Sequence, residues 1–311
     1  MALPVVRTGI AAAAPCRSTA SIETELLQEA LFRCCGFDFR DYSFATFRRR
    51  VRKHVAEENL ASVSALQANV LHDAGALQRF LHRVASRRTA MFLDPQFFLS
   101  LRREVFPLLR EKPVIRIWHA GCSTGEEVFS LAIMLHEEGL LEKTRIYATD
   151  INEASLARAR QGIIALKEMR QHTENYRLAG GNRPFSDYYA AAYGLAIFSS
   201  EIRKNIIWGR HDLACDGPIN TFDVIICRNV ISYFNAALQH RVLELLTSSL
   251  EEGGVLALGR REAFRCDESV RFTDIDPPRN LYRKADEHGQ ETMTAAAGRS
   301  ALAPDAVGSS C

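Results

Sequence analysis

Hydrophobic residues recur at three- and four-residue steps between residues 21 and about 105, and this spacing predicts helices with almost no strand. The stripes that define these helices are Phe44, Phe47, Val51 and Val55, then Ala65, Leu66 and Val70, then Leu77, Phe80, Leu81 and Val84. Asp73 and Gly75 separate the second stripe from the third. We therefore expect an N-terminal, all-helical domain over residues 21–105, built as a small bundle.

Basic residues cover the remaining faces of the first of these helices. Five cations occur within six positions, with no acid among them: Arg48, Arg49, Arg50, Arg52 and Lys53. Such residues usually form a solvated surface, but a one-signed surface of this size also suits docking to an acidic partner helix. Both interpretations stay open at this point.

The pattern changes after about Val114 to short apolar runs that alternate with helical periods. The strand-like runs are 114–118, 145–149, 205–208, 222–227 and 255–258, and the helical periods are 126–138, the segment through Leu156 and Ala159, and 238–250. This alternation predicts a parallel, doubly wound, Rossmann-like α/β sheet in a domain over residues 106–285. Two later extended segments, 270–275 and 280–283, are separated by Pro277 and Pro278, and we expect an antiparallel pair at one sheet edge.

The two ends of the chain have no pattern that could bury an apolar face. Residues 1–20 are rich in Ala with an interrupted apolar tract, which favours a disordered leader over a secretory signal. Residues 286–311 turn to Ala, Gly, Ser and acids, which predicts a disordered tail. No window reaches the roughly 18 consecutive apolar residues of a membrane span.

Composition narrows the possible partners. With 39 Lys and Arg against 37 Asp and Glu, the net charge of +2 is too small for nucleic acid or an anionic membrane as a whole-chain partner. Eight cysteines occur without a Cys-x-x-Cys pair, which excludes a spaced disulfide framework or zinc knuckle. We expect reduced thiols, a cytoplasmic location, no metal, no nucleic acid and no direct membrane insertion.

Gly121 and Gly125 lie in a turn between the first strand and its helix. Two glycines let the backbone approach a ligand closely, and the helix behind them directs free N–H groups at it. The turn is not the dinucleotide pattern, it has no Lys for a phosphate, and Glu126 and Glu127 would repel a pyrophosphate. S-adenosylmethionine fits this turn, because it carries ribose, adenine and a sulfonium cation but no phosphate.

Polar side chains follow three further strands. Asp150 ends the second strand, 25 residues beyond Gly125, where a carboxylate can accept hydrogen bonds from both ribose hydroxyls or can merely cap a helix. Asp212 and Leu213 lie at the same edge beside His211 and could hold adenine; we assign His211 no proton transfer. Arg228, Asn229 and Tyr233 follow strand 222–227, and Tyr233 is either a packed aromatic or a ring near the sulfonium, a cation-π contact of roughly 0.5–2 kcal/mol.

These motifs together resemble the CheR-type chemotaxis-receptor methyltransferases, which use S-adenosylmethionine to methylate glutamate side chains on receptor helices. The resemblance covers roughly residues 26–284. The segments that carry it are 36–40 leading to 48–51, 89–98, 117–127, 148–152 and 227–230.

The resemblance implies a class I methyltransferase sheet, a helical N-terminal domain that meets the acidic receptor coil, and a small inserted subdomain at about residues 163–203. It places the cofactor, whose product is S-adenosylhomocysteine, against residues at the motif positions: Thr89, Glu127 with Glu126 adjacent, Asp150, Asp212, Leu213, Arg228 and Asn229. Gly121 and Gly125 of the turn are expected to contact the cofactor as well. Tyr233 would lie near the transferred methyl group.

Two positions depart from the family pattern. The family segment ends in Phe-Phe-Arg or Met-Phe-Arg, but this chain has Leu93 in place of that Arg. After the fifth strand the family has Gly-His-Ser-Glu or similar, but this chain has Arg260 and Arg261 between Gly259 and Glu262. We hypothesise that Arg260 or Arg261 takes over the electrostatic role missing at Leu93.

The leading hypothesis is methyl transfer to receptor glutamates, with the basic helix gripping the acidic coil. A glutamate with a reference pKa near 4.3 is already ionised at pH 7, so the reaction needs positioning rather than a general base. Two alternatives remain: an enzyme with another protein or small-molecule acceptor, and a regulatory pseudoenzyme that binds S-adenosylmethionine without turnover.

Overall fold

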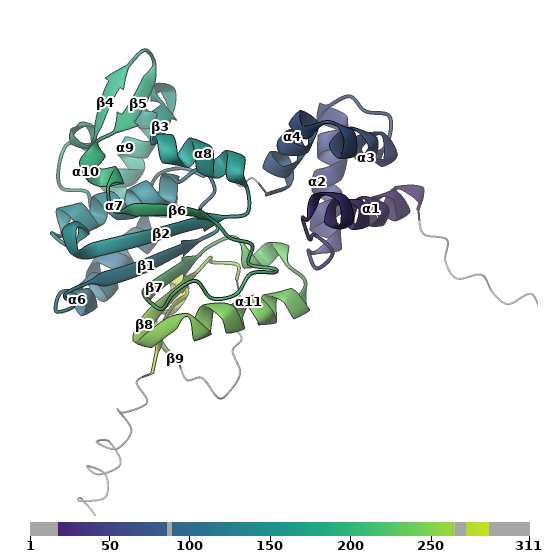
Figure 1. The fold of residues 1–311 in the computed structure, drawn as a ribbon. Helices are drawn as coiled ribbons and strands as arrows, with labels where there is room; N and C mark the ends of the chain where they lie inside the picture. Colours follow the sequence, from purple (N-terminus) through teal and green to yellow (C-terminus); the bar gives the residue numbers. More distant parts are fainter. Residues whose placement is uncertain (1–17, 86–88, 263, 265–271, 286–311) are drawn as a thin grey trace, which may run out of the picture. The chain divides into compact units, whose positions relative to one another are not determined.

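A computed structural model describes residues 18–85, 89–262, 264 and 272–285 (Figure 1). These residues divide into two compact units: unit 1 holds the described residues up to Arg40 together with Phe44–Val84, and unit 2 holds Asp41–Ser43 and the described residues from Ala85 onward. The predicted tail and most of the predicted leader lie outside the described residues. The predicted leader is too long by at least two residues, because Thr19 and Ala20 are the first residues of a helix.

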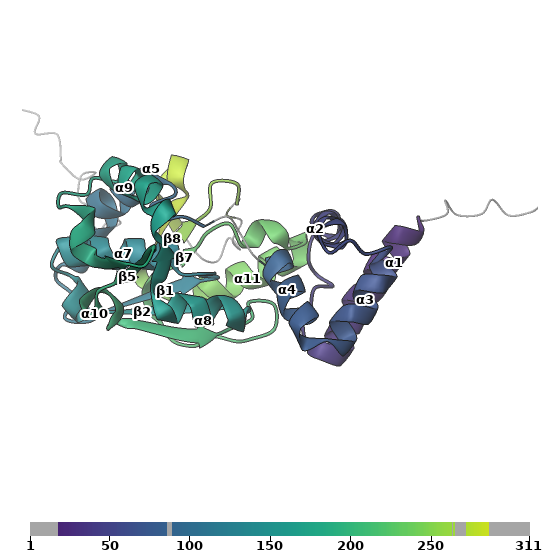
Figure 2. The same ribbon diagram turned by 90° about the horizontal axis from the view of Figure 1, so that it is seen from above.

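Unit 1 is all-helical. Its helices are α1 Thr19–Ala30, which continues into a π-helical turn over Leu31–Cys35, α2 Phe44–Glu57, α3 Val63–His72 and α4 Ala74–Ala85. Helices α1 and α3 lie side by side (Figure 2). The predicted stripe of α2 holds for Phe47 and Val51, but the third buried position is His54 rather than Val55, and burial lowers the pKa of His54.

Unit 2 is built on a seven-stranded sheet with the order β6-β2-β1-β7-β8-β10-β9. The strands are β1 Ile115–Ala120, β2 Thr144–Asp150, β6 Ile206–Arg210, β7 Phe222–Cys227, β8 Leu250–Leu258, β9 Phe272–Asp276 and β10 Leu281–Lys284. The first five strands in the sheet order are parallel, and β10 pairs antiparallel with β8 and β9. The predicted doubly wound α/β sheet with an antiparallel edge pair is therefore confirmed.

Both faces of the central strands are buried, as parallel strands require. Because side chains alternate along a strand, Val224 and Ile226 of β7 enter one core while Ile225 and Cys227 enter the other. Helix α7, Glu126–Glu137, packs in the first core, and α11, Ala236–Ser248, packs in the second.

Three short helical segments precede the sheet. They are α5 Pro95–Ser100, a π-helical turn over Leu101–Val105 and α6 Phe106–Leu109. Phe97, Phe98 and Phe106 lie in the first core of the sheet. Residues 95–105, which the helical periodicity assigned to the N-terminal domain, therefore belong to unit 2.

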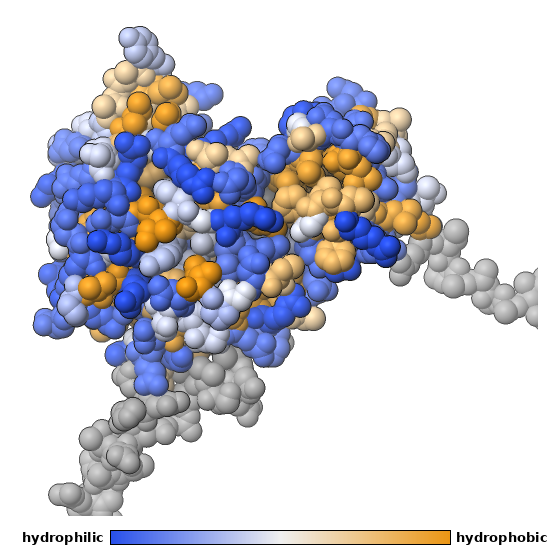
Figure 3. Space-filling model, in the orientation of Figure 1, coloured by the Kyte–Doolittle hydropathy of each residue, from blue (hydrophilic) through white to orange (hydrophobic). Residues whose placement is uncertain are grey.

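An inserted subdomain follows helix α8, Glu153–Gln161. It contains β3 Ile163–Ala165, α9 Met169–Leu178, β4 Tyr189–Ala192, β5 Leu195–Phe198 and α10 Ser200–Arg203. Its three strands form an antiparallel sheet with the order β3-β5-β4. Ile163, Leu195 and Ile197 are exposed on its outer side, where Figure 3 has a group of orange side chains over β4 and β5.

One buried carboxylate joins this insertion to the main sheet. Glu137, at the end of α7, accepts a hydrogen bond from Tyr188 Oη at 2.8 Å and another from Tyr176 Oη, and it forms an ion pair with Arg102. Burial raises the pKa of both tyrosines, so they stay protonated donors. The insertion is thus fixed by one charge with three donors.

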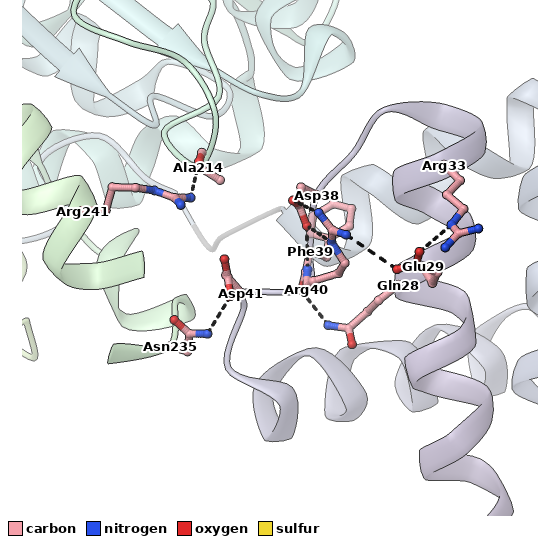
Figure 4. Close-up of polar contacts among 10 residues, drawn as sticks. All are labelled: Gln28, Glu29, Arg33, Asp38, Phe39, Arg40, Asp41, Ala214, Asn235 and Arg241. Atoms are coloured by element: carbon pink, nitrogen blue, oxygen red, sulfur yellow. Dashed lines mark hydrogen bonds and ion pairs between the residues drawn. The ribbon is translucent and has the colours of Figure 1, made fainter. Parts of the chain in front are cut away.

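Residues Asp41–Ser43 pair with the segment that leads into α11. Figure 4 shows the side-chain contact between Asp41 and Asn235. The Ser43 N–H donates to Tyr233 O at 2.7 Å, and the Asn235 N–H donates to Asp41 O at 2.8 Å. Asn235 also caps α11: its Oδ1 accepts from Leu238 N at 2.9 Å while its Nδ2 donates to Asp41 Oδ1 at 3.0 Å. One side chain therefore supports both the helix start and the 41–43 segment.

No helix within the described ranges has the length and apolarity needed to span a bilayer.

Replacing Asn235 by Ala should lower the free energy of unfolding by about 1–2 kcal/mol, because the helix loses its cap and Asp41 loses a donor. Urea unfolding followed by circular dichroism measures this. Asn235→Asp is the matched control: it keeps the cap acceptor but puts a second carboxylate beside Asp41, so its stability should fall between those of the wild type and Asn235→Ala. A loss below about 0.3 kcal/mol for Asn235→Ala would contradict the dual role.

Candidate functional site

A cavity of about 380 Å³ opens at the carboxyl ends of the strands. The residues that line it come from four separate segments: Leu93, Asp94, Glu127, Arg228, Asn229, Arg260 and Arg261. The strand order reverses between β1 and β7, and Glu127 and Arg228 follow those two strands in the sequence. Open α/β sheets bind ligands at this switch point.

The glycine turn after β1 is tied to the end of β2. Gly121 has φ +73° and Gly125 has φ +89°, both in the left-handed region. The N–H groups of Gly121 and Cys122 donate to Thr149 O at 2.7 and 2.8 Å. A Cβ at Gly125 would lie 2.9 Å from Trp208 Cη2, so only glycine fits at the start of α7.

The side chain of Asp150 also binds the glycine turn. Its Oδ2 accepts from the Ser123 N–H at 2.8 Å, and its Oδ1 accepts from the Asn152 N–H at 2.9 Å. Asn152 in turn caps α8 through the N–H groups of Ala154 and Ser155. The structure therefore brings the glycine turn and the strand-end carboxylate together, as expected from their spacing.

Arg228 is the buried centre of the cavity wall, with 4% of its surface exposed. Its Nη1 donates to Glu127 Oε1 and its Nη2 donates to Asp94 Oδ2, both at 2.8 Å. Its guanidinium carbon lies 3.8 Å from the ring centre of Phe97. One cation thus pairs with two carboxylates, and loss of the Arg228 guanidinium would leave both of them without this partner.

Arg260 and Arg261 line the same cavity and are exposed. They are the two central residues of a turn after β8 that the Glu262 N–H closes onto Gly259 O at 2.8 Å. Neither guanidinium has a hydrogen bond or ion pair with any other described residue. Leu93, 49% exposed, lies on the wall of this cavity as well.

Thr89 and Glu126 belong to a series of side-chain hydrogen bonds beside the glycine turn. Thr89 Oγ1 is 3.1 Å from Thr124 Oγ1, which donates to Glu126 Oε2 at 2.7 Å. His172 of α9 is buried, and burial lowers its pKa, although the charge of Glu126 opposes the shift. Neither Thr89 nor Glu126 lines the cavity.

Asp212 and Leu213 follow β6 and also lie off the cavity wall. Asp212 Oδ1 accepts from the Ala214 N–H at 2.9 Å. Burial raises the pKa of Asp212, and the neighbouring Asp216 carboxylate adds to the rise. Leu213 is buried in the second core, and the His211 ring nitrogen Nε2 lies 2.9 Å from Gly217 O.

Tyr233 is half-buried, packs against the second core and is not among the residues that line the cavity. Its proposed position near the methyl group stays a prediction.

The five cations predicted for docking are not equivalent. Arg48 donates to Ser21 Oγ at 2.8 Å and Arg50 donates to Val84 O, so both hold unit 1 together. Arg49, Arg52 and Lys53 are exposed. The basic surface of α2 is therefore smaller than the sequence indicated.

Two carboxylates of the site were missed from the sequence. Asp94 pairs with Arg228, and its position directly after Leu93 in the 89–98 motif was the available signal. Glu262 is buried next to Arg260 and Arg261, and its match to the Glu of the family's Gly-His-Ser-Glu segment was the available signal. In the described part of the chain, no group of three or more His, Cys, Asp or Glu side chains is arranged to hold a metal ion.

Comparison with known proteins agrees with this architecture. The family description "CheR methyltransferase, all-alpha domain" matches residues 22–85, and "CheR methyltransferase, SAM binding domain" matches residues 87–279.

Two relatives cover most of the chain. A Pseudomonas putida protein named "Putative methyltransferase Cher3" is 48% identical over 265 residues, covering 85% of this chain and 97% of that protein. A chemotaxis protein methyltransferase of Listeria innocua is 31% identical over 232 residues, covering 74% of this chain and 86% of that protein. The chain belongs to the CheR methyltransferase family and is an S-adenosylmethionine-dependent methyltransferase.

Proposed function

We propose that this methyltransferase transfers the methyl group to glutamate side chains on a helical coil of a chemoreceptor. The observation that carries the proposal is the charge at the cavity. Arg228 is paired with Asp94 and Glu127, whereas Arg260 and Arg261 have no partner among the described residues. The cavity therefore has two guanidiniums available for an anionic acceptor. Relatives named as chemotaxis protein methyltransferases support a chemoreceptor as its source.

The residues around the turn fit S-adenosylmethionine. Glu127 and Asp150 supply carboxylates for a cation and for hydroxyls, and the turn has no Lys that would select phosphate. We assign cofactor binding to the motif residues Thr89, Gly121, Gly125, Glu126, Glu127, Asp150, Asp212, Leu213, Arg228 and Asn229. When bound, the cofactor supplies a methyl group on a positively charged sulfur.

The protein's own task is then to bind and orient a carboxylate. An ionised glutamate needs no base, because its reference pKa is near 4.3. A guanidinium binds a carboxylate through two parallel N–H donors, which fixes the direction of the attacking oxygen. Positioning of this kind contributes on the order of 7–11 kcal/mol, and removal of water from the oxygen adds to it.

Tyr233 is assigned to the methyl-transfer step, where its ring would face the sulfonium. Arg260 and Arg261 are assigned to the acceptor carboxylate, in the role left open by Leu93.

The exposed part of the basic surface, Arg49, Arg52 and Lys53, is assigned to docking. These cations lie on α2 with no acid between positions 48 and 53. An acidic helical coil is the complementary partner, because opposite potentials accelerate encounter and fix orientation.

Asp150→Asn should weaken the binding of S-adenosylhomocysteine by about tenfold or more, because an amide nitrogen would face the Ser123 or Asn152 N–H and a charged acceptor would be lost. Titration calorimetry with the purified protein measures the dissociation constant. Asp187→Asn, a carboxylate in the insertion, is the control and should bind as the wild type does. An Asp150→Asn affinity within twofold of the wild type would contradict the cofactor assignment.

Arg260→Ala combined with Arg261→Ala should reduce methyl transfer to a receptor cytoplasmic fragment by about tenfold or more, with little change in S-adenosylhomocysteine affinity. Transfer is measured with a radiolabelled methyl donor, and release of the label by mild base identifies a carboxyl methyl ester. Arg177→Ala, which removes an exposed guanidinium of α9, is the control. Full turnover in the double variant disproves the acceptor role, and base-stable label indicates a different acceptor.

Affinity for the receptor fragment should fall steeply with ionic strength, because exposed charges are screened beyond about 10 Å at 0.1 M salt. Replacing Arg49, Arg52 and Lys53 by Ala should remove most of this dependence, whereas S-adenosylhomocysteine binding should not respond. Fluorescence anisotropy of a labelled receptor fragment at several salt concentrations measures the affinity of the unmodified protein and of the variant. A salt-independent affinity in the unmodified protein would exclude docking through the basic helix.

A further inference from the structure

The Glu262 side chain lies under the turn that carries Arg260 and Arg261. Only 3% of its surface is exposed. Its Oε2 accepts from the Gly259 N–H at 2.6 Å and from the Asn229 N–H at 2.8 Å, and its Oε1 accepts from the Ser232 N–H at 3.1 Å. A single carboxylate therefore joins the exit of β8 to the exit of β7.

The turn over 259–262 is closely packed and hydrogen-bonded at both ends. A Cβ at Gly259 would lie 2.5 Å from Glu262 Oε2 and 2.7 Å from the Asn229 nitrogen, so glycine is needed for this approach. On the opposite side, Asn280 Nδ2 donates to Gly259 O at 2.7 Å and to Glu262 O at 3.0 Å. Both ends of the four-residue turn are thus held, while its two central arginines project to the cavity.

The backbone that Glu262 holds at β7 is also unusual. Asn229 has φ +56°, a left-handed conformation that side-chain-bearing residues adopt rarely and Asn tolerates best. Its N–H points at the carboxylate, and Asn229 and Arg228 both line the cavity. The Glu262 carboxylate therefore stabilises a backbone conformation of Asn229 that is unfavourable on its own.

We propose that Glu262 is the positioning residue of the methyl-transfer site, which holds Arg260 and Arg261 toward the acceptor and Asn229 toward the cofactor. Three N–H donors converge on it, and only a group that accepts at both ends satisfies them. Glutamine has a single acceptor end, so it can keep the two bonds at Oε2 only by placing its NH₂ against the Ser232 N–H. The inference has two halves. The acceptor half, in which Glu262 holds Arg260 and Arg261 toward the acceptor carboxylate, rests on the function proposed above. The cofactor half, in which Glu262 holds Asn229 toward the cofactor, does not.

The test compares two buried carboxylates of unit 2. Glu262→Gln alters the site, and Glu137→Gln alters the network at the opposite end of α7 from Glu126 and Glu127. Glu262→Gln should lower kcat/KM for methyl transfer to the receptor fragment about tenfold and weaken S-adenosylhomocysteine binding about threefold, while Glu137→Gln changes each by less than twofold. A general loss of packing would affect both variants alike.

A second comparison separates positioning from stability. In a background with Arg260→Ala and Arg261→Ala, and with S-adenosylmethionine at a saturating concentration, Glu262→Gln should reduce kcat/KM for the receptor fragment by less than twofold, because the two arginines that it positions are absent. An equal reduction in both backgrounds overturns the acceptor half. If Glu262→Gln does not fold, Asn280→Gly removes the other support of the turn without backbone strain and should give the same pattern with a smaller effect.

The outcomes distinguish this inference from the proposed function. If Arg260→Ala and Arg261→Ala leave transfer unchanged, the proposed acceptor role fails and S-adenosylhomocysteine binding decides the inference. In that case, weaker S-adenosylhomocysteine binding by the Glu262→Gln variant but not by the Glu137→Gln variant supports the positioning role of Glu262. Binding and turnover equal to those of Glu137→Gln overturn it.

Discussion

One buried guanidinium organises the site. Arg228, between Asp94 and Glu127, joins the loop before α5, the start of α7 and the exit of β7. These segments are distant in the sequence, and a buried ion pair that loses one partner is destabilised by about 3–5 kcal/mol, so they hold their places only together. Arg228 offsets only one of these two carboxylates, so the positive charge that an anionic substrate meets at the cavity comes from Arg260 and Arg261.

Several carboxylates of unit 2 serve to fix the fold, and those at the carboxyl ends of the strands accept hydrogen bonds from backbone N–H groups. Asp150 fixes the glycine turn and Glu262 fixes the turn after β8, whereas Glu137, at the other end of α7, fixes the insertion through side-chain donors. An acidic residue near a ligand site is therefore not by itself a catalytic group here. This division of roles is consistent with a reaction whose acceptor arrives already ionised and requires orientation rather than proton transfer.

The elements that follow local rules could be predicted from the sequence. Strand β7 was predicted at its observed bounds because it is apolar on both faces, and α7 ends before Gly139, whose φ is +69°. Strand β8 begins five residues earlier than expected, since Gly253 and Gly254 interrupt the apolar pattern within the strand. The glycine turn and Asp150 were recognised because their spacing follows from one strand–helix–strand unit.

The contacts that depend on three-dimensional arrangement could not be predicted. Asp94 meets Arg228 across 134 positions of sequence, and Glu262 meets Asn229 across 33. Periodicity also could not separate Arg48 and Arg50, which bind within unit 1, from the exposed cations beside them, because long basic side chains reach partners from several faces.

The most direct test of the central claim is to map the methylated residue. A receptor cytoplasmic fragment is incubated with the enzyme and S-adenosylmethionine, digested and sequenced by mass spectrometry. The account predicts methyl esters on glutamate side chains of the helical coil, absent when the enzyme is omitted. Methylation confined to nitrogen, sulfur or hydroxyl groups, or no methylation by an enzyme that binds S-adenosylhomocysteine, would contradict it.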